Sequence, residues 1–170
     1  MSLLSWGKPT IITKPEGGNK YRKLHTPVEG STSLDTTEGD KTEAKIEGGE
    51  IEDVRYNKST FQLKFQIRGL KNGKKPFSEK DGIVSGNHSF WVVPEDPACP
   101  GIQILKSHVS VKTSFTAADG VLYDVTVDAL SNDTGDAQCQ FGTVTPTESG
   151  GNISAVVFVE VKAEDESSAA

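Results

Sequence analysis

The stretch that decides the fold runs from residue 60 to residue 68 and reads Thr-Phe-Gln-Leu-Lys-Phe-Gln-Ile-Arg. Apolar and polar side chains alternate through it without exception. Because successive side chains of a β-strand point to opposite faces, we expect a strand with one buried and one polar face. The expected buried face consists of Phe61, Leu63, Phe65 and Ile67, and the polar face consists of Gln62, Lys64, Gln66 and Arg68.

Similar patterns recur on both sides of this stretch at the spacing of hairpins. We expect further strands at residues 9–14, 20–24, 41–47, 87–93, 102–115, 121–130, 138–144 and 153–162, with turns rich in Gly, Pro and Asp-Gly between them. In the segment 41–47 the alternation places one charged set on a single face, namely Lys41, Glu43, Lys45 and Glu47. Residues 26–39 are expected to be a polar connection, and residues 50–53 an acidic link.

The strand expected at 87–93 differs from the others because Phe90, Trp91, Val92 and Val93 are apolar on both faces. Such a run is typical of a strand that is buried on both sides, so Trp91 is expected in the core. About nine strands and no amphipathic helix predict an all-β protein, a sandwich or barrel with at most one short helix at 77–83. We expect an N-terminal arm at 1–8, one β domain at 9–162 and a flexible acidic tail at 163–170.

Charge is divided unevenly between the two halves of the chain. Residues 1–80 contain 15 basic and 11 acidic residues, a net charge of +4, whereas residues 81–170 contain 3 basic and 13 acidic residues, a net charge of −10. This asymmetry is either ordinary surface chemistry or a sign of opposite surfaces that meet head to tail in an assembly. The acidic balance argues against a groove that grips nucleic acid, but it leaves room for a surface past which DNA slides.

No motif for catalysis, metal binding or cofactor binding occurs in the sequence, so we expect no enzyme activity and no cofactor. The acidic segment 47–53 lacks the pattern of a calcium loop. The N-terminus lacks a signal peptide and no segment is long enough to span a membrane, which predicts a chain kept in the cytoplasm. The isolated histidines are expected to be ordinary surface or strand residues and the cysteines to be free thiols: His25, His88, His108, Cys99 and Cys139.

Residues 34–50, which read Leu-Asp-Thr-Thr-Glu-Gly-Asp-Lys-Thr-Glu-Ala-Lys-Ile-Glu-Gly-Gly-Glu, and the strand that follows at 54–68 together resemble phage tail tube proteins. These proteins often carry a polar charged strand, a loop and a strongly alternating strand. Residues 114–130 look like the closing hairpin of such subunits. The resemblance extends in overall pattern over residues 9–161. It departs from the family in one respect, because only the segment 77–83 could supply the flanking α-helix.

The resemblance implies a barrel-like β-sandwich whose copies form hexameric rings that stack into a hollow tube. The polar faces at 41–47 and 62–68 would then face the lumen or a neighbouring subunit, and the arm with Leu3, Leu4 and Trp6 would dock on the next ring. The implied partners are the chain itself, other tail proteins and DNA that passes without specific binding, with no membrane. The implied location is the virion tail, assembled in the bacterial cytoplasm.

A second interpretation is a β-sandwich that binds carbohydrate or mediates adhesion. It requires an exposed aromatic platform, for which the sequence offers Trp6, Tyr21, Phe90 and Trp91. An enzyme whose groups assemble only in space is the third possibility.

Overall fold

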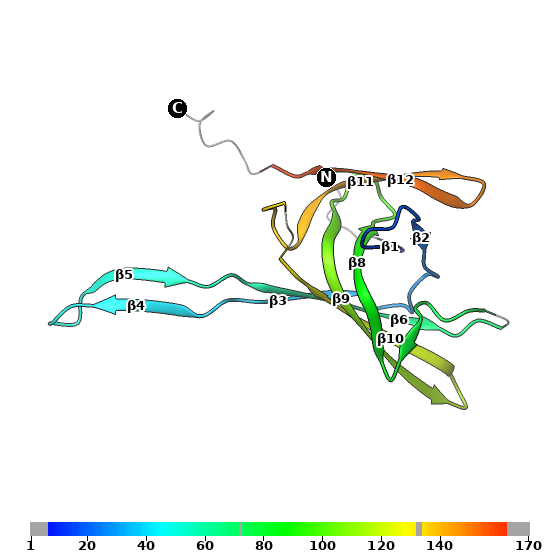
Figure 1. The fold of residues 1–170 in the computed structure, drawn as a ribbon, viewed down its shortest axis with the longest axis horizontal. Helices are drawn as coiled ribbons and strands as arrows, with labels where there is room; N and C mark the ends of the chain where they lie inside the picture. Colours follow the sequence, from blue (N-terminus) through cyan, green and yellow to red (C-terminus); the bar gives the residue numbers. More distant parts are fainter. Residues whose placement is uncertain (1–6, 72, 132–133, 163–170) are drawn as a thin grey trace.

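The computed structural model describes residues 7–71, 73–131 and 134–162, and these form β-strands connected by turns and loops, with no helix (Figure 1). The all-β fold is therefore as predicted. The strands are β1 (Thr10–Pro15), β2 (Arg22–Lys23), β3 (Ser33–Thr37), β4 (Lys41–Lys45), β5 (Ile51–Tyr56), β6 (Thr60–Arg68), β7 (Glu79–Lys80), β8 (Ile83–Val93), β9 (Gly101–Thr116), β10 (Gly120–Ala129), β11 (Gln140–Ser149) and β12 (Asn152–Glu160).

One antiparallel sheet forms the body of the molecule, with the strand order β2-β1-β8-β9-β10-β6-β3. The β11–β12 hairpin branches from this sheet, because β11 pairs with β9 only over residues 140–142. Strands β4 and β5 form a separate two-stranded ladder. The described residues include no helix of the length and apolarity that a membrane crossing requires.

The main core lies on the predicted face of β6. Leu63, Phe65 and Ile67 are at most 4% exposed, and Phe61 packs against them at the margin of the core. The rings of Phe65 on β6 and Phe90 on β8 lie 6.4 Å apart, although these strands are not neighbours in the sheet. The sheet therefore curves over its own apolar face. Burying side chains of this size contributes about 1.5–3 kcal/mol each, as an upper estimate.

A second, smaller core lies on the other face of β1 and β8. Ile12 and Trp91 pack there against Val144 and Ile153 of the β11–β12 hairpin. The side chains at 90–93 in β8 thus alternate between the two cores, which confirms that this apolar run is buried on both sides. The body has three layers, with β8 and its neighbours in the middle.

The sequence prediction was wrong in two segments, and the short helix that it allowed at 77–83 does not form. Residues 33–37 form β3, because their backbone pairs with β6 even though their side chains are mostly exposed. Residues 51–56 form β5 rather than a link. The segment 77–83 contains the short strand β7 and no helical turn, since Asp81 and Gly82 both have positive φ angles, of 53° and 84°, which a right-handed helix does not accommodate.

Candidate assembly surfaces

Strands β4 and β5 form an arm that projects from the body (Figure 1). The arm prolongs the β3–β6 pair, because the Asn57 N–H donates to the Asp40 carbonyl at 2.9 Å between the two ladders. Ile46, Ile51 and Tyr56 are 46%, 51% and 61% exposed. A two-stranded hairpin with so little buried surface is only marginally stable in water. The faces of the arm are therefore open to a partner.

The arm carries the first set of predicted site residues. Lys41 Nζ lies 2.8 Å from Glu43 Oε1, and Lys45 Nζ lies 3.7 Å from Glu43 Oε2, so these three side chains form one surface chain of ion pairs. Glu47 does not extend this face, because β4 ends at Lys45 and residue 47 lies in the turn. In that turn the Gly49 N–H donates to the Ile46 carbonyl at 3.2 Å, and Gly48 adopts a φ of 95° that favours glycine.

The second predicted set lies on the body, on the solvent side of β6. Gln62 Nε2 donates to Asp128 Oδ1 at 2.9 Å, and Lys64 Nζ lies 3.5 Å from Asp35 Oδ2. Arg68 pairs with Asp119 of the β9–β10 turn at 3.7 Å. Within the described residues no ion pair joins this set to the arm, so the two predicted sets belong to two separate surfaces.

The solvent side of β6 is part of a wider surface, which we call the polar face, on β3, β6, β10 and β9. The strand register aligns Gln66 with Asp124 and Asp124 with Lys112, and it aligns Lys64 with Thr126. The charges on this face balance, with three acidic and three basic side chains: Asp35, Asp124, Asp128, Lys64, Arg68 and Lys112. A polar hollow of about 520 Å³ lies between the segment 29–33 and these strands. One oxygen of Asp124, Oδ1, is buried there and has no hydrogen-bond partner among the described residues.

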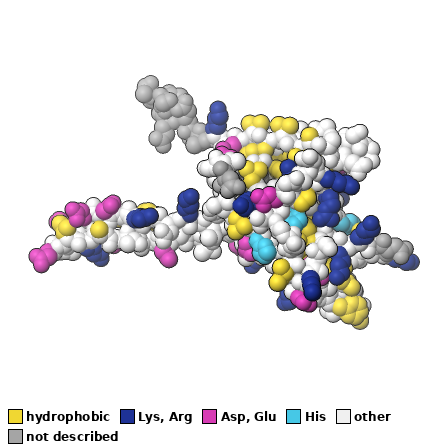
Figure 2. Space-filling view, in the orientation of Figure 1, with side chains coloured by type: hydrophobic (Ala, Val, Ile, Leu, Met, Phe, Trp, Pro, Cys, Tyr) yellow, Lys and Arg dark blue, Asp and Glu magenta, His cyan; other side chains and the backbone are white. Residues whose placement is uncertain are grey.

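The β11–β12 hairpin exposes an apolar stripe that the sequence analysis did not identify. Val157, Val159 and Val161 are each at least 55% exposed, and Phe141 on the neighbouring strand is 44% exposed. Figure 2 shows hydrophobic side chains gathered along this side of the molecule. Among the described strands, β12 pairs only with β11, so its outer edge has no strand partner in that part of the chain. A long apolar edge strand of this kind favours pairing with another chain. The alternation of valines from 157 to 161 is the sequence pattern that could have revealed it.

A basic groove of about 210 Å³ lies between β2, the end of β6 and the loop 69–76. Its basic side chains are Arg22, Lys23, His25, Arg68, Lys74 and Lys75. The Arg22 guanidinium lies over the Phe77 ring, 5.3 Å from its centroid, and partial burial lowers its pKa. Burial, and then the charge of Arg22, lower the pKa of His88. The residues of the groove are far apart in the sequence, which gives no local signal for it.

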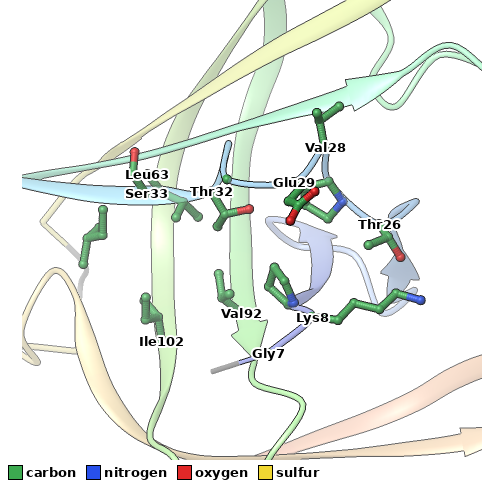
Figure 3. Close-up of a pocket in the computed structure, with 14 residues that line it drawn as sticks. Gly7, Lys8, Thr26, Val28, Glu29, Thr32, Ser33, Leu63, Val92 and Ile102 are labelled. Carbon is green, nitrogen blue, oxygen red and sulfur yellow. The ribbon is translucent and has the colours of Figure 1, made fainter. Parts of the chain in front are cut away.

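A cavity of about 620 Å³ lies at one end of the main core, between residues 7–9 and 26–34. The side chains of Leu63, Val92 and Ile102 form its apolar side (Figure 3). Lys8 and Glu29 are the titratable groups in its described lining, which offers no paired nucleophile and base for catalysis.

The remaining candidates are structural or lie outside the described residues. No three His, Cys, Asp or Glu side chains of the described chain are placed to hold a metal ion. Cys99 and Cys139 are free, and burial raises the pKa of Cys139 to about 11. Leu3, Leu4 and Trp6 of the predicted docking arm, and the predicted tail at 163–170, lie outside the described residues.

The predicted aromatic platform is not formed by Phe90 and Trp91. Phe90 is fully buried, and Trp91 is 5% exposed. Tyr21 packs on the Trp91 ring, with the ring centroids 5.4 Å apart. The Trp91 indole N–H donates to Gln103 Oε1 at 2.7 Å, inside the protein. Phe90 and Trp91 are therefore core residues and do not present a ring face to a sugar.

Comparison with known proteins gives no family for the chain. No family model matches it, and no curated protein does either.

Proposed function

We propose that the protein is a self-assembling structural subunit, the tail tube protein of a phage or of a related injection system. Its copies form rings, hexameric in the family that the sequence resembles, and the rings stack into a hollow conduit. The proposal places the assembled protein in a virion tail, in contact with other tail proteins.

The observation that carries the proposal is the arm. It extends away from both cores and leaves Ile46, Ile51 and Tyr56 exposed. A projecting hairpin of this kind adds no buried side chain to either core of its own subunit. Its apolar side chains would become buried by contact with another copy. The open edges of β3 and β12 add two further surfaces through which one sheet can continue into the next.

The polar face suits the wall of a conduit for DNA. Its three acidic and three basic side chains balance, and Lys64 and Arg68 are already paired with carboxylates. A duplex that passes such a wall finds few free cations to replace its counterions, so it is not held.

Sedimentation across a wide range of protein concentration, together with negative-stain images of the purified chain, tests the proposal. We expect rings or tubes with a central hole. A strict monomer at every concentration, in low and in high salt, contradicts the proposal. Glycan binding by such a monomer would favour the carbohydrate-binding alternative.

A further inference from the structure

The end of the arm is acidic, and its carboxylates have no cationic partner in the part of the chain that the structure describes. The tip, residues 46–53, contains Glu47, Glu50, Glu52 and Asp53 and no basic residue. Within the described residues none of these four carboxylates takes part in an ion pair. Ile46 and Ile51 lie among them and are about half exposed, at 46% and 51%. The tip is therefore a ligand of defined chemistry, with several negative charges around two aliphatic side chains.

The basic groove has the complementary chemistry. Arg22 and Lys74 line it, and neither has a carboxylate within ion-pair distance among the described residues. Leu70, which is 51% exposed, and Tyr123 add apolar surface to its wall. The pKa of the Arg22 guanidinium is lowered by burial, which means that the groove holds a cation that has lost part of its water without gaining an anion.

The tip and the groove of one chain lie on opposite sides of the molecule. In Figure 1 the arm leaves the body on one side, and the segments 69–71 and 73–76, the second of which carries Lys74 and Lys75, lie on the other. Figure 2 shows acidic side chains at the end of the arm and basic side chains gathered on the far side of the body. A chain therefore cannot fill its own groove, and a second copy can do so.

We propose that the acidic tip of one copy binds the basic groove of the next copy. The carboxylates of the tip pair with Arg22 and Lys74, and Ile46 or Ile51 packs against Leu70 and Tyr123. Because the two surfaces differ, the contact is head to tail and repeats from copy to copy. The inference rests on the proposed self-assembly, and it names the two surfaces that meet.

Complementary charge-reversal variants of the full-length chain test this contact. The tip variant is E47K/E50K/E52K, and the groove variant is R22E/K74E, with K23E/K74E as a second groove variant if loss of Arg22 prevents folding. Each variant alone should associate about tenfold or more weakly than the natural chain, because like charges then face each other. An equimolar mixture should recover association, since the intact tip of one variant then meets the intact groove of the other and the reversed tip meets the reversed groove, each with opposite charges.

A cysteine pair checks the same contact at residue level. A copy with Ile51→Cys and a copy with Leu70→Cys, both in a Cys99→Ser background, should form a disulfide-linked dimer when mixed under oxidising conditions. The matched control replaces Leu70→Cys by Ser149→Cys on the β11–β12 hairpin and should give no such dimer.

The charge contact should also weaken from about 0.1 M to about 1 M salt, over which the Debye length shortens from about 10 Å to about 3 Å.

The outcomes separate this contact from the proposed function. If both reversed variants still form rings or tubes as the natural chain does, self-assembly stands and the tip-to-groove contact is overturned. If the natural chain forms no rings or tubes but mixing the two variants restores an association that neither shows alone, the contact stands and the tube proposal fails. If only the groove variants lose association, another acidic segment occupies the groove and the inference is wrong.

Discussion

At the scale of single residues, the second core is organised by a chain of buried amides. The Trp91 indole N–H donates to Gln103 Oε1 at 2.7 Å, and Gln103 Nε2 donates to Gln140 Oε1 at 2.8 Å. Gln103 and Gln140 are each 8% exposed. These hydrogen bonds link β8, β9 and β11 at the point where the β11–β12 hairpin branches from the sheet. The polar network therefore fixes the register of β11 against β9, which apolar packing alone would specify less strictly.

Replacing Gln103 by leucine should therefore destabilise the protein although it adds apolar surface. The substitution leaves the Trp91 N–H and the Gln140 amide without partners, which costs about 1–3 kcal/mol of unfolding free energy. Urea denaturation followed by tryptophan fluorescence measures the loss. Thr143→Val, on the exposed side of β11, is the control and should change the unfolding free energy by less than about 0.5 kcal/mol. Equal stability of the two variants would show that the amide chain contributes nothing.

The two cysteines should differ in reactivity. Burial raises the pKa of Cys139 from 9.0 to about 11, and the thiolate is the reactive form. At pH 8 we expect a thiol reagent to modify Cys99 in the folded protein and to reach Cys139 only after denaturation. The folded state favours the neutral Cys139 thiol, so its contribution to stability is complete below pH 9 and is lost as the pH rises towards about 11. Mass spectrometry of the labelled chain identifies the modified residue, and rapid labelling of both thiols at pH 8 contradicts the expectation.

At the scale of the elements, strands with an apolar face were predictable from sequence and strands without one were not. The alternation in β6 placed Leu63, Phe65 and Ile67 correctly because burial rewards that pattern directly. Strand β3 places a single side chain, Leu34, against the main core, and the strand forms because the edge of β6 supplies backbone partners. Strand β5 is likewise held by its ladder with β4, so its acidic composition concealed it. The local alternation of polar and apolar residues does not predict which distant segments pair as strands.

Excising the arm should separate folding from assembly. Asp40 and Asn57 already lie across from each other through a backbone hydrogen bond of 2.9 Å, so an Asn-Gly turn can replace residues 41–56. No residue of either core is removed, and the unfolding free energy should change by less than about 1 kcal/mol. We expect the shortened chain to remain folded by circular dichroism and to sediment as a monomer. Tubes that form as readily without the arm would show that it has no part in assembly.

At the scale of the whole molecule, the sequence indicated the asymmetry of charge but not its arrangement. The acidic tip is a continuous segment and was visible as residues 47–53, whereas the basic groove combines residues 22–25, 67–68, 70, 74–76 and 123. The polar face also draws on four strands, of which the sequence analysis named only β6 as a candidate surface. Surfaces assembled from distant strands depend on topology, so they could be recognised only in the folded chain.

The balance of charge on the polar face leads to a prediction about DNA. Natural tubes should not retain DNA, because Lys64 and Arg68 are paired with Asp35 and Asp119. The variant D35K/D128K removes two negative charges from this face and adds two positive ones, and it should retain DNA that is protected from nuclease, with an affinity that falls steeply as salt rises. The control E148K/E160K adds the same charge to the β11–β12 hairpin and should bind DNA that nuclease removes. If both variants protect DNA from nuclease equally, the polar face does not line the conduit. Only DNA that is bound inside the tube is shielded from the nuclease.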